Sequence, residues 1–146
     1  MTNANSTTAA PASRQAAVLR PSSIKAHDRG GGASTIPLVG PSVGAAAFIN
    51  GITSFGPGTK IPFHSHNCEE SVMLLEGNAM LDIDGQPSVQ LQPLDTTWLP
   101  ANLSHRFRNL SDTEPMKILW IYARVDATRT LTESGATNFV SAEHNK

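Results

Sequence analysis

From residue 45 onward, short runs of apolar and β-branched residues alternate with turn residues such as Pro57-Gly58, Gly77-Asn78 and Asp84-Gly85. The runs span residues 45–55, 61–66, 71–76, 79–83, 89–91, 96–99, 105–108 and 117–123. Runs of this length and spacing are typical of strands in a sandwich or barrel. No stretch keeps a helical period for more than a couple of turns. The pattern therefore predicts an all-β fold with little helix.

Both ends of the chain lack this pattern. Residues 1–17 and 141–146 hold few bulky apolar side chains, so neither end buries enough surface to offset the entropy of ordering. The glycine-rich stretch 29–34 indicates a flexible hinge, so residues 36–39 are free to pair on their own sheet or on that of a neighbouring subunit. We therefore expect three segments: a flexible N-terminal segment and hinge over 1–35, a barrel domain over 36–125, and a C-terminal extension and tail over 126–146.

Composition excludes some classes of function. The chain of 146 residues has 11 basic and 12 acidic side chains, a formal net charge of -1, so no strong field attracts nucleic acid or anionic lipid. One cysteine, Cys68, excludes an intrachain disulfide, and the N-terminus lacks the apolar core of a secretory signal. No apolar run approaches the roughly 20 residues of a membrane span. We expect a soluble, cytoplasmic protein with neither nucleic-acid nor membrane partners.

Candidate metal ligands are concentrated in two segments. His64 and His66 stand two residues apart on an expected strand, so both imidazoles project from one face. A turn over 67–69 lets Glu70 return a carboxylate to the same point, and His105 opens a later strand. Three imidazoles and one carboxylate suit one divalent transition ion, namely Fe(II), Mn(II), Ni(II), Co(II) or Zn(II), whereas Mg or Ca prefers oxygen ligands. Four protein ligands on an octahedral ion leave two positions for substrate or dioxygen.

The first segment resembles a signature motif of the cupin superfamily. That motif is Gly, five residues, His-x-His, three residues, Glu, six residues, Gly. It is matched in full by Gly58, His64, His66, Glu70 and Gly77. The histidines and the glutamate of the motif are the positions already singled out as metal ligands.

The second segment resembles the partner motif, which is Gly, five residues, Pro-x-Gly, two residues, His, three residues, Asn. Its matching positions are Pro100, His105 and Asn109. Both glycines are replaced, by Leu94 and Asn102. Asn tolerates a left-handed backbone, whereas Leu94 after Pro93 indicates a type I turn instead of type II. Together the motifs cover residues 58–109, and the strand pattern extends the resemblance to about 45–123.

The resemblance implies a double-stranded β-helix, the jelly-roll β-barrel of cupins, around the metal. Cupins include dioxygenases, isomerases, decarboxylases, lyases and epimerases, besides storage and sensor modules. Because all metal positions are intact, we expect an enzyme for a small organic substrate, first of all a dioxygenase-type oxidoreductase. The alternatives are a binding or sensor module, or a metal-dependent isomerase or lyase with a base such as Tyr122 or Lys60. Glu70 is either the fourth ligand or a catalytic general base.

Strand parity selects the residues expected around the substrate. Counting from His105 places Phe107 and Asn109 on the inner face, and counting from Glu70 places two aliphatic side chains there. The expected pocket residues are Phe107, Val72, Leu74 and Trp98, with a place in the hydrophobic core as the favoured alternative for Trp98. Asn109 matches the family motif, and we expect it to make a hydrogen bond behind the metal ligands or within a turn.

The outer faces of the strands predict self-association. Met73 and Leu75 point outward by the same count, and Ile118 to Tyr122 is continuously apolar. Apolar residues on both faces of a strand indicate that the outer face is covered. We therefore expect a homodimer packed through sheet faces, with a polar-surfaced monomer as the alternative.

Overall fold

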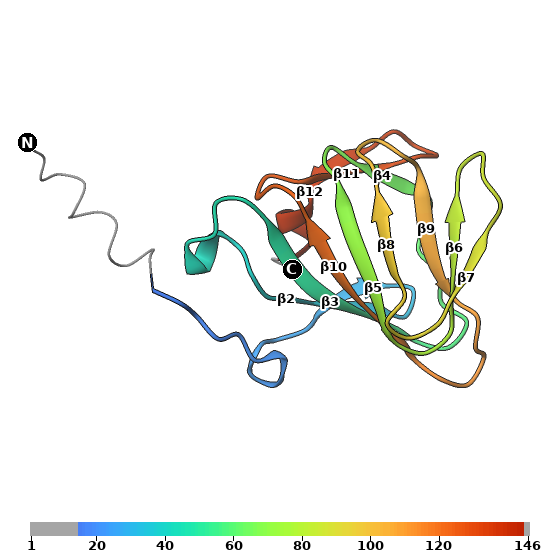
Figure 1. The fold of residues 1–146 in the computed structure, drawn as a ribbon, viewed down its shortest axis with the longest axis horizontal. Coiled ribbons are helices and arrows are strands. Elements are labelled where there is room, and N and C mark those ends of the chain that lie inside the picture. Colours follow the sequence, from blue (N-terminus) through green and yellow to red (C-terminus); the bar gives the residue numbers. More distant parts are fainter. Residues whose placement is uncertain (1–14, 145–146) are drawn as a thin grey trace, which may run out of the picture.

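The computed structural model describes residues 15–144 and folds as two antiparallel sheets (Figure 1). The first sheet has the order β1 (His27–Gly30), β2 (Ala33–Pro37), β3 (Ile49–Phe55), β10 (Met116–Tyr122), β5 (Glu70–Glu76), β8 (Thr96–Leu99). The second has the order β12 (Thr137–Phe139), β11 (Thr128–Leu131), β4 (His64–His66), β9 (His105–Asn109), β6 (Ala79–Ile83), β7 (Val89–Leu91). These sheets confirm the expected all-β jelly-roll class.

Helix in the described residues is limited to short 3-10 segments, as the sequence predicts. They are η1 (Pro21–Ser23), η2 (Pro41–Val43) and η3 (Val140–His144). No helix in the range 15–144 is long and apolar enough to cross a membrane. The expected flexible tails fall partly outside the described residues, at 1–14 and 145–146.

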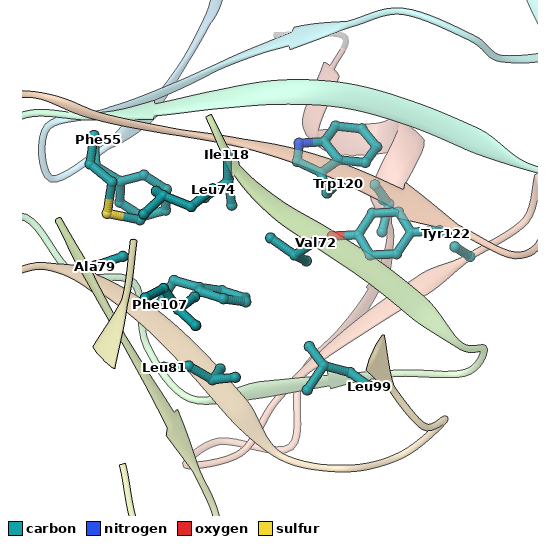
Figure 2. Close-up of a cluster of buried hydrophobic side chains, with 14 of the residues drawn as sticks. Phe55, Val72, Leu74, Ala79, Leu81, Leu99, Phe107, Ile118, Trp120 and Tyr122 are labelled. Carbon is teal, nitrogen blue, oxygen red and sulfur yellow. The ribbon is translucent and has the colours of Figure 1, made fainter. Parts of the chain in front are cut away.

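The core lies between the sheets because inner and outer residues alternate along each strand. On β3 and β10, which pair over their whole lengths, every second residue is buried. Val72 and Leu74 on β5 are fully buried, as strand parity predicts. Figure 2 shows how the apolar side chains of both sheets meet. Gly51 makes room for its cross-strand partner Trp120, since a Cβ there would come within 2.4 Å of the indole.

The strands reach beyond the expected 36–125 barrel domain on both sides. Residues 27–37 form a hairpin whose connecting residues, Gly31 and Gly32, have φ of 63° and 92°. Positive φ at both positions suits a tight hairpin turn, so these glycines make a turn and not the open hinge expected from the sequence. β2 then pairs with β3 of its own chain, and β11 and β12 extend the second sheet.

The turn before β8 differs from the expected type I. Leu94 has φ of 78°, and the Asp95 N–H donates to the Gln92 carbonyl at 3.0 Å. A left-handed residue after Pro93 is the mark of a type II turn. The expectation was wrong because pairing overrides local preference here: the Leu94 N–H donates to the Leu74 carbonyl at 2.7 Å. Leu94 thus adopts the conformation of the glycine it replaces in the motif.

This strain makes Leu94 a site for stabilisation. Leu94→Gly should raise the free energy of unfolding by about 0.5–1 kcal/mol, because a left-handed Leu costs about 1–2 kcal/mol and glycine recovers most of that. The side chain is 69% exposed, so little apolar burial is lost. Urea denaturation followed by circular dichroism measures the change. Leu94→Ala keeps the Cβ and is the control; a glycine variant no more stable than the alanine variant would contradict the strain argument.

Candidate metal centre

Three histidines meet on the inner face of the second sheet. His64 on β4 pairs directly with His105 on β9, and His66 lies two residues along β4. One ring nitrogen of each lies within 4.8 Å of the others. The three side chains are at most 3% exposed. The strand spacing thus brings the predicted imidazoles together at one point.

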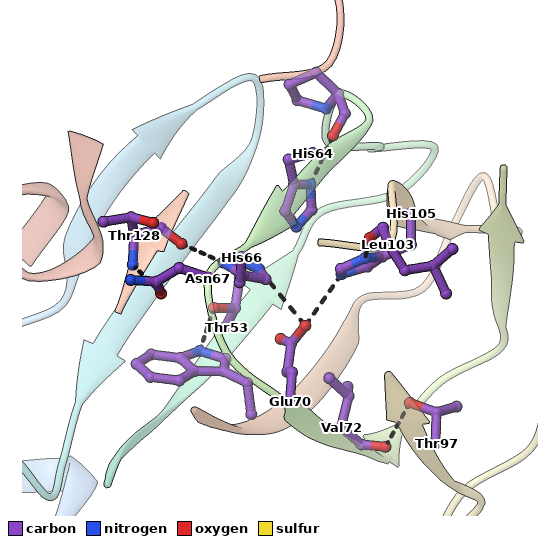
Figure 3. A network of polar contacts seen from close by, with 12 residues as sticks. Thr53, His64, His66, Asn67, Glu70, Val72, Thr97, Leu103, His105 and Thr128 are labelled. Carbon is purple, nitrogen blue, oxygen red and sulfur yellow. Dashed lines mark hydrogen bonds and ion pairs between the residues drawn. The ribbon is translucent and has the colours of Figure 1, made fainter. Parts of the chain in front are cut away.

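Backbone carbonyls orient all three rings (Figure 3). Each Nδ1 lies against one: Pro62 for His64 at 2.8 Å, Thr128 for His66 at 2.9 Å and Leu103 for His105 at 2.8 Å. Because a carbonyl oxygen only accepts, Nδ1 carries the hydrogen and Nε2 keeps its lone pair for the interior. This arrangement is typical of histidines that bind metal through Nε2.

Glu70 approaches the histidines from the opposite sheet. Its Oε1 lies 3.0 Å from Nε2 of His105 and 3.6 Å from Nε2 of His66, and the side chain is 4% exposed. Nε2 of His66 is buried without a hydrogen-bond partner. With Nδ1 protonated, these nitrogens and the carboxylate oxygen are all acceptors, so a cation among them would satisfy the group. The residues present therefore fit one divalent ion held by three nitrogens and an oxygen.

Burial favours the neutral form of two of the three imidazoles, those of His64 and His66. Burial, assisted by the charges of His105 and Arg129, holds the pKa of His64 well below its ordinary value. Burial also lowers the pKa of His66, although Glu70 opposes this shift. Neutral imidazole is the form that ligates metal.

A narrow cavity of about 40 Å³ lies next to the cluster. Space of this size holds about three water molecules. Its walls include His64, Glu70 and the expected Phe107. Tyr122 also lines it, with its ring centroid 4.4 Å from that of His66. The cavity thus joins the candidate metal ligands to a phenol.

The other expected pocket residues lie elsewhere. Val72 and Leu74 belong to the fully buried core and do not line this cavity. Trp98 is 66% exposed, and its indole N–H donates to Oε1 of Glu69 at 2.6 Å. Placing Trp98 in the pocket was wrong because its neighbour Leu99 takes the inner position of β8.

Asn109 has the second of its two expected roles, a hydrogen bond within a turn, since its Oδ1 accepts from the Ser111 N–H at 2.9 Å. The Asn109 amide donates to the carbonyls of Gly56 at 3.0 Å and Glu114 at 2.8 Å, so it stabilises loops and does not contact the histidines.

The cavity is also lined by Arg29 and Arg129, which the sequence analysis missed. Both lie outside the two motifs. Arg129 is on β11, which pairs with the histidine strand β4, whereas Arg29 is on β1 at the edge of the other sheet.

Comparison with known proteins agrees with this architecture. The cupin domain family model matches residues 51–122. Polyketide synthase CurC of Streptomyces cyaneus is 36% identical over 87 residues, covering 59% of this chain and 55% of CurC. Auxin-binding protein 4 of Zea mays is 32% identical over 81 residues, covering 50% of this chain and 40% of that protein. The chain spans about half the length of the curated relatives it matches.

Solved structures extend the likeness to most of the fold. A sugar phosphate isomerase from a cupin superfamily, of Silicibacter pomeroyi, aligns with a TM-score of 0.67 and 25% identity, covering 86% of this chain and 94% of that one. The polyketide cyclase RemF of Streptomyces resistomycificus aligns with a TM-score of 0.69 and 19% identity, covering 86% of both chains, which shows the fold alone. The chain therefore contains a small cupin domain and belongs to the cupin superfamily.

Proposed function

We propose that this protein is a metal-dependent enzyme that moves protons on a small carbonyl compound, as an isomerase, cyclase or lyase does. One divalent transition ion would be held by His64, His66, His105 and Glu70, and when bound would supply Lewis-acid polarisation of a carbonyl oxygen. The observation that carries the proposal is Tyr122, whose ring packs 4.4 Å from that of His66. This chemistry needs an acid or base at the metal, and Tyr122 is such a group.

The cavity walls suit proton transfer. Tyr122 is 8% exposed and faces Glu70 across the β5–β10 pair, so a phenol and a carboxylate lie on adjacent strands of one cavity. In this proposal Tyr122 donates to the developing oxyanion, while Glu70 completes the ligand set or accepts the proton from carbon. Phe55 and Phe107 keep bulk water from the reacting atoms. The isomerase and cyclase names of the two structural relatives support this class of reaction.

A dioxygenase-type oxidoreductase is the second candidate. The same four ligands would leave two open positions on an octahedral ion, beside an aromatic wall formed by Phe55, Phe107 and Trp120. That arrangement suits dioxygen and a small aromatic or enolic substrate. A non-catalytic binding module would bind such molecules and transform none of them.

Proton exchange tests the first candidate. The metal-loaded protein is mixed with pyruvate or dihydroxyacetone phosphate in D2O under argon, and NMR follows loss of the signals of protons next to the carbonyl. We expect exchange faster than with free metal ion, and Tyr122→Phe should slow it about 100-fold. Trp98→Phe changes an exposed aromatic side chain outside the cavity and is the control. No exchange with either probe would contradict proton transfer, whereas oxygen uptake in air with acetylacetone would favour the dioxygenase.

We also propose that the protein forms a homodimer through the outer face of the first sheet. Ile36, Ile52, Leu119 and Met73 occupy neighbouring positions on four adjacent strands, so they form one apolar row across the sheet. Trp98 on β8 lies 66% exposed at the edge of this face. A second identical sheet face is the natural complement of such a row, in a two-fold symmetric dimer.

Light scattering after gel filtration tests the dimer. The expected mass is twice the 15.5 kDa of one chain. Leu119→Lys should shift the protein to monomer, because it places a charge in the middle of the row. Val89→Lys puts the same charge on an exposed position of the other sheet and should leave the mass unchanged. A wild-type monomer at micromolar concentration would rule out this interface.

A further inference from the structure

A surface groove lies next to the cavity of the metal centre. It has a volume of about 740 Å³ and is bordered by the residues before β4, the start of β9 and the loop after β11. The half-buried side chain of Ile61 lines both this groove and the cavity of His64 and Glu70. We propose that the groove binds an apolar part of a carbonyl substrate, with Ile61 as the gate to the metal centre. This inference rests on the proposed function, since it names the substrate class of that site.

The sizes of the two spaces indicate that a substrate occupies both. The cavity of about 40 Å³ has room for about three water molecules, so a substrate with more than about four non-hydrogen atoms extends beyond it. The groove of about 740 Å³ falls within the range of about 300–1,000 Å³ that is usual for small-molecule sites. A molecule whose reacting carbonyl lies at the metal centre therefore finds room for the rest of its structure past Ile61.

The barrel wall is interrupted between the groove and the metal centre. Lys60 pairs with Arg108 of β9. Further along the chain, His64 pairs with His105. Residues 61–63 thus face only two residues of β9, which makes them a β-bulge, where one extra residue disrupts the ladder and re-aims side chains. The middle residue is a proline, which has no N–H to donate. The wall here is therefore formed by side chains, which can move without breaking a continuous ladder.

The lining of the groove favours an apolar, uncharged ligand. Ile61, Phe63 and Leu131 supply apolar surface from three sides of the bulge and the neighbouring strand β11. Charge around the groove is balanced, so neither an anion nor a cation is attracted by a net charge. The charged residues that line it, among those that the structure describes, are Lys60, Arg106, Asp84 and Glu133.

Phe63 is held in place before any ligand binds. The Cζ atom of Arg106 lies over its ring, 4.5 Å from the centroid. Arg106 is itself fixed, because its Nε donates to Oδ2 of Asp82 at 2.8 Å. The Phe63 carbonyl also accepts from the Thr132 N–H at 3.0 Å. A ring fixed in this way is preorganised, so binding an apolar ligand against it costs little side-chain entropy.

Methyl NMR of the metal-free protein, with carbon-13-labelled isoleucine, tests the groove without turnover. The probes are the methyl ketones from acetone to 2-heptanone, whose chains lengthen by one methylene at a time. We expect them to shift the Ile61 methyl signal, which Ile61→Val assigns by its loss, and to bind about 3-fold more tightly for each added methylene. Phe63→Ala should weaken binding of 2-heptanone about 10-fold. Phe139→Ala is the matched control, because Phe139 is exposed on β12 outside the groove.

Modification by diethyl pyrocarbonate tests the gate in the same metal-free protein. Mass spectrometry follows the carbethoxylation of His64, with His27 on β1 as the internal reference. Ile61→Ala should speed modification of His64 several-fold, because it opens the wall between groove and cavity. Ile83→Ala is the matched control: Ile83 also packs against the core but lines neither space, so its loss should leave the rate unchanged.

The outcomes separate this inference from the proposed function. Binding that does not depend on chain length, or equal effects of the two phenylalanine variants, would overturn the apolar site. Equal rates of His64 modification in the two isoleucine variants would overturn the gate. Melting temperature is measured for each variant; where Phe63→Ala unfolds, Leu131→Ser takes its place and should also weaken binding of 2-heptanone. Binding that strengthens with chain length, without proton exchange in the metal-loaded protein, would retain the groove and reject the proposed reaction.

Discussion

Protein purified without chelator is expected to carry about one equivalent of a divalent transition metal, and the double variant His64→Ala/His66→Ala is expected to carry almost none. The variant removes two of the four atoms that surround the proposed ion, and the remaining pair offers only a weak site. Elemental analysis measures the metal directly. The loss should be complete, because no other described group of histidines, cysteines and carboxylates is arranged to hold an ion.

Two further variants test whether the loss of metal is specific to the proposed site and which role Glu70 has. His27→Ala removes a histidine of β1 that does not belong to the cluster and should leave the metal content unchanged. Glu70→Gln separates the two roles of the carboxylate: a ligand role predicts lower metal content, whereas a general-base role predicts full metal content with slower proton exchange. A wild-type protein that takes up none of the iron, manganese, nickel, cobalt or zinc ions would contradict the metal centre.

The candidate metal ligands could be predicted from the sequence because strand geometry is regular. Residues two apart on a strand share a face, so His64 and His66 had to project together. Pairing of β4 with β9 then sets His64 opposite His105, which the motif spacing anticipated. The hydrogen bonds that orient the rings are made to backbone carbonyls, such as that of Thr128. Every residue has a backbone carbonyl, so the sequence does not indicate which one will lie against a given ring.

The errors have physical reasons of their own. β8 is only four residues long, so the sequence pattern did not decide which of its residues face the barrel interior. In the structure Leu99 faces inward and Trp98 faces outward. Leu94 adopts a left-handed backbone because pairing to β5 requires it, against its local preference. Arg29 and Arg129 reach the cavity through strands at the two ends of the chain, where no motif or strand run pointed. Tertiary pairing, which a single sequence does not reveal, decided each case.

An ion-pair network on the outer side of β6 and β9, around the buried Asp82, illustrates the same limit. Asp82 on β6 is 6% exposed, although a solvated position is usual for aspartate. Its carboxylate accepts from Arg106 Nε at 2.8 Å, Arg108 Nε at 2.7 Å and Ser88 Oγ at 2.6 Å. Both arginines lie on the neighbouring strand β9, where Arg106 stands directly opposite Asp82. One carboxylate therefore joins β6 to β9 and to the loop before β7.

Asp82→Asn should lower the free energy of unfolding by about 2 kcal/mol at pH 7, because it leaves two part-buried guanidinium groups without their counter-charge. The expected loss of unfolding free energy is smaller than that for a fully buried ion pair. The side chains of Arg106 and Arg108 are 24% and 33% exposed, so water screens their charges. Hydrogen bonding from Arg108 is the main cause that holds the pKa of Asp82 well below its ordinary value, with burial opposing it.

The pH dependence of this loss follows from the sign of the shift. A carboxyl whose pKa is lowered in the folded state contributes stability above its unfolded pKa, near 3.9 for aspartate, and that contribution is lost as pH falls further toward the folded pKa. Urea denaturation of wild type and Asp82→Asn should therefore show a constant difference from pH 7 to about pH 5 and a shrinking one below about pH 4. Asp126→Asn, at an exposed pair with Arg124, should change stability little at any pH. A difference between wild type and Asp82→Asn that did not shrink in acid would mean that packing of the side chain, and not its charge, stabilises the β6–β9 pair.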